Sequence, residues 1–436
     1  MDKIKNVKEK ICDIIEDQSA SIIDLVKDIH AHPELGYKEF RTSEIVNDFL
    51  RSAGYDTERG LAITGIKTKL KKEHLRPNIV FISELDGITC PESSNANKIT
   101  GATHNCGHHL QIGVMLAVAQ AFMKSGMASQ LDGNIIFIAS PAEEYIELEY
   151  RSELQRQGKI RYFGGKQELV RCGAFDDVDA TMMVHAQGNT PYPFAGTVNF
   201  GNGLIAEMIR YIGKTAHAAA APEEGINALQ AAVLGINAMN AMRETFRDED
   251  RNRVHYIITK GGDAINSVPS DVRLESIVRS NTITSMRQLL EKTERAFRSG
   301  GDAVGASTEI KRLSGYLPLV CNKGLNSVFI ENARQFITEN QVTTIDFFKA
   351  STDMGDITHL MPAIHPFVGG VSGALHAANF EVADYIAAVI TPAKIVASTI
   401  VDLLMNDAVK MRSIIENNQP LLTKQMYFEI IDSFFT

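Results

Sequence analysis

The sequence predicts an α/β fold into which a smaller α+β module is inserted. Three short apolar runs, at residues 78–85, 134–140 and 181–184, have the composition of strands buried in a parallel sheet. Helical patterns separate these runs, and such alternation is typical of a sheet with helices on both faces. From about residue 195 to 312 the expected order becomes strand, helix, strand, strand, helix, strand, which is the order of a ferredoxin-like module.

Length and charge set the domain count and exclude several classes of partner. The 436 residues exceed one ordinary domain, so we expect one domain from residues 1–195 and 313–436 and a second from residues 196–312. The formal net charge is -9 without a basic block, which argues against nucleic acid and anionic membrane surfaces as partners. Apolar stretches are broken before the roughly 20 residues that a membrane span needs.

Each element follows from the spacing of apolar residues. The first 53 residues are expected to be helical with a break at Pro33 and Gly36. Between residues 54 and 195 we expect strands at 62–70, 78–85, 134–140 and 181–184 and a buried helix at 109–126. The module should hold strands near 196–212, 253–258, 271–279 and 309–313, with helices near 223–241 and 285–298. After Gly315 we expect helices at 325–339 and 380–404 and a docked C-terminal helix.

Cysteine usage indicates a reducing compartment. The chain has five cysteines, an odd and sparse set for this length, which favours free thiols over a disulfide framework. The N-terminal segment is charged on both sides of its apolar positions and lacks the core of a signal peptide. We therefore expect a cytoplasmic protein.

The densest group of reactive side chains is His104-Asn105-Cys106-Gly107-His108-His109. Imidazole and thiolate are ligands for soft or borderline cations, so this loop is a candidate metal site. Two alternatives remain open: a loop of surface histidines around one buried thiol, and a nucleophilic cysteine with a nearby histidine.

Glu143 and Glu144 form the second candidate group, directly after the apolar run at 134–140. Adjacent side chains diverge, so one carboxylate can bind a metal while the other accepts a proton from a metal-held water. The alternative is an acidic helix start, where carboxylates interact favourably with the helix dipole.

Single polar residues at strand ends complete the candidates. His185 and Asp86 each end a predicted strand, and His376 follows a Gly-rich segment. Asp86 could orient a ligating imidazole or merely cap a turn. His217 lies between a strand and a helix of the inserted module, and Asn266 lies in a second turn there. Taken singly, a histidine such as His185 or His376 is more often a structural residue than a ligand, and the alternative for His217 is a loop histidine before a helix.

At these residues the chain resembles the aminoacylase/carboxypeptidase metallopeptidases. It is most similar to their amidohydrolase branch, which includes hippurate, auxin-conjugate and p-aminobenzoyl-glutamate hydrolases. The resemblance runs nearly end to end through the pieces HAHPELGYKEFRTS, SELDGI, HNCGHH, ASPAEE, VHA, GKTAHAAAAPEEGINAL, INSVPSDVRLESIVR, STDMGD and ALH. It implies a zinc-exopeptidase-like catalytic domain with two divalent metal ions, Zn²⁺ or Mn²⁺, and an inserted lid domain that makes a homodimer.

The resemblance also implies a role for each matching residue. The metal ligands would be Cys106, His108, Glu144, His185 and His376, with Cys106 bridging the two ions. Glu143 would be the general base, and Asp86 would support a ligand. His217 would polarise the scissile carbonyl, often in the partner subunit's site, and Asn266 would lie near the substrate carboxylate.

Two residues depart from the branch: His109 and Gln111 replace the usual Asp or Asn and the usual His. Separately, residues 145–166 form an unusual stretch rich in Glu, Arg and Gln, for which a substrate or dimer role is possible. We expect a metal-dependent amidohydrolase that cleaves N-acyl or N-aminoacyl amino acids or small dipeptide-like substrates, with a metal-bound water as nucleophile. The alternatives are a catalytically silent binding protein that keeps the fold, and a dipeptidase or carboxypeptidase.

Overall fold

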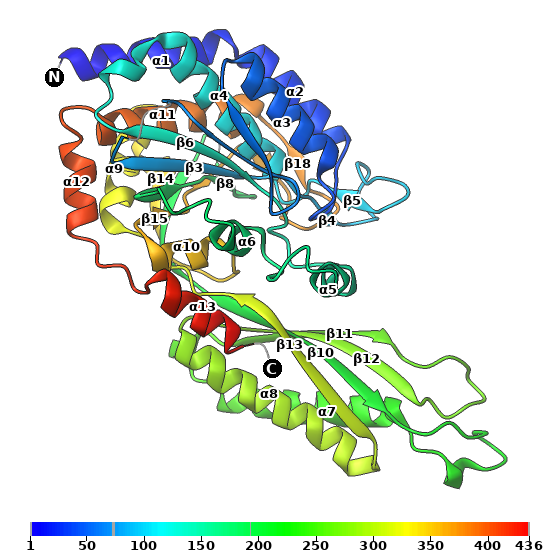
Figure 1. The fold of residues 1–436 in the computed structure, drawn as a ribbon. Helices are drawn as coiled ribbons and strands as arrows, with labels where there is room; N and C mark the ends of the chain where they lie inside the picture. Colours follow the sequence, from blue (N-terminus) through cyan, green and yellow to red (C-terminus); the bar gives the residue numbers. More distant parts are fainter. Residues whose placement is uncertain (1, 72–74, 192, 435–436) are drawn as a thin grey trace. The chain divides into compact units, whose positions relative to one another are not determined.

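The computed structural model describes residues 2–71, 75–191 and 193–434. Contacts group the chain into two compact units (Figure 1). The first unit contains Met1–Asn199, Val320–Phe347 and Asp356–Leu421, and the second contains Phe200–Leu319, Phe348–Gly355 and Leu422–Thr436. The division into a catalytic domain and a lid domain at residues 196–312 stays a prediction.

A six-stranded sheet forms the centre of the first unit, in the order β1-β2-β6-β3-β7-β15. Strands β3, β6, β7 and β15 are mutually parallel. At one edge of the sheet, β2 pairs antiparallel with β6, and β1 pairs antiparallel with β2. Every residue of β3 and β6 is buried, as expected for strands covered on both faces. The bounds are β1 Thr57–Leu61, β2 Gly65–Lys69, β3 Asn78–Glu84, β6 Asn134–Ser140, β7 Ala180–Met182 and β15 Ala363–Ile364.

Helices pack around this sheet, and α4 (His108–Ser125) is the most deeply buried of those named here. Fifteen of its residues are buried, so its apolar character on all sides fits a helix enclosed by neighbours. It contacts α1, α2, α3 and α11 as well as β3. The bounds of these helices are α1 Asp2–Asp17, α2 Ser19–Ala31, α3 Phe40–Ser52, α9 Lys323–Ala333 and α11 Thr391–Leu404.

A second sheet, in the order β14-β9-β16-β8, carries one of the candidate histidines. Strand β8 (His185–Ala186) pairs in parallel with β16 (Phe367–Val368). Strand β9 covers Ala195–Gly201 and β14 covers Val342–Phe348. The single strand expected at 196–212 is therefore wrong, because the chain leaves this sheet at Asn202 and starts β10 (Gly203–Ile212) in another sheet.

The second unit has the predicted ferredoxin-like order. Its antiparallel sheet runs β11-β12-β10-β13, and buried and half-buried residues alternate along β12. Helices α7 and α8 pack closely together, since a Cβ at Gly300 would lie 2.2 Å from the carbonyl oxygen of Ala231. The bounds are α7 Ala228–Ala241, β11 Arg253–Lys260, β12 Asp271–Ser280, α8 Ile283–Val304 and β13 Ser307–Tyr316.

The C-terminal part differs from the expected elements in detail. The helix predicted at 380–404 begins only at Ile386, as a π-helical turn that continues into α11, and the helix predicted at 325–339 ends at Ala333. Among the described residues, Ile386–Leu404 is the one helix long and apolar enough to cross a membrane, and 78% of it is buried in the fold. The docked C-terminal helix is present as α13 (Lys424–Asp432), which contacts β13.

Candidate metal centre

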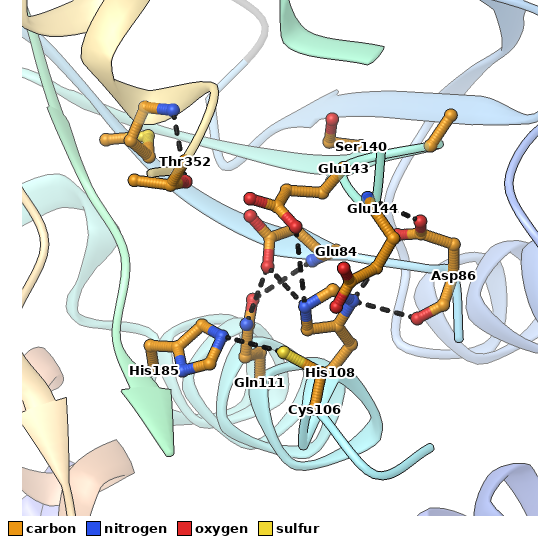
Figure 2. A network of polar contacts seen from close by, with 12 residues as sticks. Glu84, Asp86, Cys106, His108, Gln111, Ser140, Glu143, Glu144, His185 and Thr352 are labelled. Carbon is orange, nitrogen blue, oxygen red and sulfur yellow. Dashed lines mark hydrogen bonds and ion pairs between the residues drawn. The ribbon is translucent and has the colours of Figure 1, made fainter. Parts of the chain in front are cut away.

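Cys106 lies where the ends of several elements of the first unit meet (Figure 2). Its Sγ is 3.5 Å from Nε2 of His185 and 3.2 Å from Nε2 of His376, which is 270 positions away in the chain. The next residue, Gly107, has a φ of 85°, and a Cβ there would lie 2.8 Å from Cβ of Ala186. Glycine at this position therefore lets the turn bring the thiol close to β8.

Side chains of the kinds that bind metals form three groups, and within each group the ligand atoms lie within 4.8 Å of one another. The first group is Cys106, His108 and His185, and the second is Cys106, Glu144 and His376. The thiol belongs to both groups, so one sulfur atom faces two sets of nitrogen and oxygen donors. The third group is Glu84, His108 and Glu143.

Backbone carbonyls orient two of the imidazoles. His108 is the first residue of α4, and its Nδ1 lies 2.8 Å from the carbonyl oxygen of Asp86 and 3.3 Å from the carboxylate. Nδ1 of His185 lies 2.8 Å from the carbonyl oxygen of Ala186. A carbonyl oxygen only accepts, so Nδ1 of each ring carries the proton. Nε2 of each ring is therefore the nitrogen directed into the cluster, where it can hold a second proton or bind a cation. Burial lowers the pKa of His108, but Glu84 and Cys106 outweigh it and raise that pKa well above its ordinary value.

Asp86 also connects the ends of two parallel strands. Its Oδ2 accepts a hydrogen bond of 2.9 Å from the backbone N–H of Glu144. On the other side of this turn, Ala142 has a φ of 51° and donates its N–H to Oε1 of Glu39. Burial and the charge of Asp86 raise the pKa of Glu39 to about 8. Two carboxyl groups thus hold the Glu143-Glu144 turn in position through its backbone.

The stretch at 145–166 contributes to the same turn. It forms α5 (Leu148–Arg156) and leads into α6 (Gly165–Arg171). The guanidinium of Arg151 is buried and donates hydrogen bonds to the carbonyl oxygens of Phe163 and Glu144. Lys166, which is fully buried, forms an ion pair of 2.5 Å with Glu84. This stretch therefore supplies two buried cations to the cluster: Arg151 binds the carbonyl oxygen of Glu144, and Lys166 binds the carboxylate of Glu84.

Strong electrostatic coupling is the main property of the centre. Burial and Glu144 raise the pKa of the Cys106 thiol, but the charges of His108, His185 and His376 outweigh them and bring it to about 6. The charge of Glu144 is the main reason why the pKa of His376 rises to about 12. Burial alone would raise the pKa of Glu144, yet His376 lowers it to about 2.

These atoms fit a pair of divalent cations. The thiolate, the carboxylates and the Nε2 lone pairs are all electron-pair donors, and Nε2 of His108 makes no well-aligned hydrogen bond within the described residues. Donors this close repel one another unless positive charge lies between them. Sulfur, nitrogen and oxygen in these combinations are ligand sets that Zn²⁺ accepts, and carboxylate oxygens also suit Mn²⁺.

The two replaced residues, His109 and Gln111, face different neighbours. The ring of His109 stacks on His30 with centroids 4.5 Å apart and lies 5.2 Å from the ring of His104. Burial lowers the pKa of His104 and His109 well below its ordinary value, so both rings are neutral. Of the three histidines in HNCGHH, only His108 reaches the donor groups, and Gln111 donates a hydrogen bond of 2.8 Å to Glu84.

His217 and Asn266 lie on adjoining turns of the second unit. The backbone N–H of Ala218 donates to the carbonyl oxygen of Asn266. Nδ1 of the exposed His217 ring accepts hydrogen bonds of 3.2 and 3.1 Å from the N–H groups of Ala219 and Ala220. In the neutral ring the proton is therefore on Nε2, which is free to act as a donor.

Sequence reasoning missed several residues that shape the centre. Glu84 had a usable signal, because it stands two positions before Asp86 and alternate strand residues share a face. Glu39, Arg151 and Lys166 had none, since they reach the centre from helices and turns whose packing the sequence does not reveal.

A known domain family matches part of the second unit. Residues 202–303 match the M20 peptidase dimerisation domain. The chain carries an M20-type dimerisation domain. The similarity to M20 proteins extends beyond it: Xaa-Arg dipeptidase from Mus musculus is 27% identical over 389 residues, or 84% of this chain and 80% of that protein. The N-acyl-L-amino acid amidohydrolase from Geobacillus stearothermophilus is 25% identical over 320 residues, or 72% of this chain and 81% of that protein.

A solved M20 structure shows the same fold. A dinuclear metal-binding peptidase of the M20 family from Bacillus subtilis has a TM-score of 0.64 and covers 89% of this chain and 99% of its own, at 19% identity. The resemblance to the aminoacylase/carboxypeptidase metallopeptidases and the expected mixed α/β fold are thereby confirmed.

The electrostatics of the centre predict an acidic thiol in metal-free protein. The thiolate absorbance that is lost in Cys106→Ser should titrate with a midpoint near pH 6, because three imidazoles favour the thiolate. Ultraviolet difference titration against wild type measures this midpoint. Cys321→Ser is the matched control, since burial raises the pKa of that thiol to about 12. A Cys106 midpoint at 9 or above would contradict the described electrostatics.

Proposed function

We propose that this protein is a metal-dependent amidohydrolase acting on N-acyl or N-aminoacyl amino acids or on small dipeptide-like substrates. The observation that carries the proposal is the shared thiol of Cys106, flanked by two donor groups, with the carboxylate of Glu143 beside them. The two relatives described above, whose names state an acyl-amino-acid amidohydrolase and a dipeptidase, support this class of reaction.

In this proposal five side chains hold two divalent ions, Zn²⁺ or Mn²⁺. Cys106 would hold one ion together with His108 and His185, and the other together with Glu144 and His376. The first set is buried, whereas the side chain of His376 is 52% exposed. A substrate would therefore approach from the His376 side.

The bound ions would supply a water of lowered pKa and positive charge for the oxyanion of the transition state. Glu143 would accept the proton of this water and pass it to the leaving amine. Its carboxylate oxygen lies 4.0 Å from Nε2 of His108, whereas the adjacent Glu144 is 3.1 Å from His376. The divergence of the two side chains thus separates the basic role from the ligand role, and Asp86 holds both His108 and the backbone of Glu144.

His217 would supply the remaining donor to the oxyanion. Its Nδ1 is occupied by two backbone N–H groups, so Nε2–H is the donor it can offer. A donor directed at a developing oxyanion is worth roughly 3–4 kcal/mol. Asn266, on the adjoining turn, would bind the substrate carboxylate through its side-chain amide.

We also propose a cytoplasmic homodimer formed through the second unit. β11 is an edge strand, and its Ile257 and Ile258 are 60% and 44% exposed. An exposed apolar edge strand is a ready surface for pairing with a second chain, and the matched dimerisation domain spans this strand. All five cysteines are free, which suits a reducing compartment.

The dipeptidase alternative is favoured by one observation, namely that the Xaa-Arg dipeptidase relative spans 84% of this chain. Metal-loaded protein tested on N-acyl amino acids and dipeptides in parallel would separate the two substrate classes. Absence of hydrolysis of every substrate would instead favour the catalytically silent alternative.

Glu143→Gln should abolish nearly all turnover on this panel while retaining bound metal, because the amide cannot accept the proton. Hydrolysis is measured by release of the free amine, and metal content by elemental analysis. Glu249→Gln, an exposed glutamate of the second unit, is the control. Turnover of Glu143→Gln near the wild-type rate would show that Glu143 is not the base.

His217→Ala should lower turnover by about 100- to 1,000-fold, the effect of losing one oxyanion donor, without changing metal content. Mixing this variant with Glu143→Gln under conditions of subunit exchange tests whether sites are shared. In a symmetric dimer, about a quarter of the sites would then combine an intact base with an intact histidine from the other chain. Recovery of activity towards that level is expected, and no recovery would mean that His217 does not serve the partner's site.

A further inference from the structure

We propose that Glu84 is an additional carboxylate ligand of the metal ion held by His108, an inference that rests on the proposed function. Glu84 is the last residue of β3 and is fully buried. Its Oε2 lies 3.1 Å from Nε2 of His108, and the two residues share a donor group with Glu143. Figure 2 shows its carboxylate facing the imidazole, on the side of the cluster away from Asp86.

The distance between the two atoms suits a common ion. Two donors that are each about 2.1 Å from one metal stand about 3.1 Å apart when the angle at the metal is close to a right angle. Nδ1 of His108 donates to the carbonyl oxygen of Asp86, so Nε2 is the nitrogen that faces Oε2 of Glu84, with room for a proton or a metal ion between the two atoms. A divalent ion would replace that proton and bind both atoms at once.

Neighbouring side chains fix the orientation of Glu84. Nζ of Lys166 lies 2.5 Å from Oε1, on the far side of the carboxylate. The side-chain amide of Gln111 donates to Oε2 at 2.8 Å and accepts from the backbone N–H of Glu84 at 3.1 Å. Lys166 thus neutralises one oxygen while Gln111 holds the other towards His108. In this arrangement Gln111, one of the two residues that depart from the family pattern, and Lys166 both serve to orient the carboxylate of Glu84.

An added oxygen donor has a consequence for metal choice. Thiolate and imidazole favour Zn²⁺, while carboxylate oxygen suits Mn²⁺. The two donor groups that share His108 would then offer the sulfur of Cys106, the nitrogens of His108 and His185, and the oxygen of Glu84. Glu84 therefore raises the affinity for Mn²⁺ more than the affinity for Zn²⁺, which a purely structural ion pair with Lys166 would not do.

The test is the double variant Glu84→Leu/Lys166→Met. It removes the donor together with its buried cation, so that no unpaired charge is left inside the fold. Affinities of the metal-free protein for Mn²⁺ and Zn²⁺ are measured by competition with a chelator, and folding by circular dichroism. Glu207→Gln, which changes another fully buried glutamate, in the second unit, is the control. Glu84→Asp serves as the test variant if the double variant does not fold.

We expect the Mn²⁺ affinity of one of the two ions to fall by about 100-fold or more, the upper end of what loss of a mere supporting residue causes, and the Zn²⁺ affinity to fall less. Unchanged affinities, or equal losses for both metals, would overturn the ligand role while leaving the proposed function in place. A wild-type chain that binds neither metal would overturn both.

Discussion

The convergence of electron-pair donors on the thiol of Cys106 is the constraint on which the rest of the site depends. Sulfur, three Nε2 atoms and several carboxylate oxygens lie within a few ångströms of their neighbours in a largely buried space. Such a group is unfavourable without positive charge, and the lowered pKa of the thiol and the raised pKa of His376 express that demand. A pair of divalent cations meets it more fully than protons do, because each cation interacts with several donors at once.

The surrounding fold keeps these donors in place by using the backbone. Carbonyl oxygens of Asp86 and Ala186 fix the imidazoles of His108 and His185, and the carboxylate of Asp86 fixes the turn that bears Glu144. Arg151 and Lys166 add buried cations behind the same turn. The stretch at 145–166 thereby helps to hold Glu84 and the turn that bears Glu144 in place.

Sequence patterns predicted the parts of the molecule that depend on local spacing. The buried runs at 78–85 and 134–140 appear as β3 and β6, and the order of elements in the second unit is ferredoxin-like. Long-range contacts were beyond reach: nothing in the pattern shows that Arg151 binds the carbonyl of Glu144. The stacking of His109 on His30 could not be predicted either, because the sequence of a histidine-rich loop does not distinguish rings that face a metal from rings that face one another. The break between β9 and β10 was missed because only one residue, Asn202, separates the two strands, and the strand pattern continues on both sides of it.

The central claim, that two divalent ions share the sulfur of Cys106, is tested most directly by anomalous diffraction from crystals of the zinc-loaded protein. The account predicts two anomalous peaks per chain, both about 2.3 Å from Sγ of Cys106. One peak would lie next to His108 and His185, and the other next to Glu144 and His376. A single peak, or two peaks of which either lies beyond bonding distance of that sulfur, would contradict it.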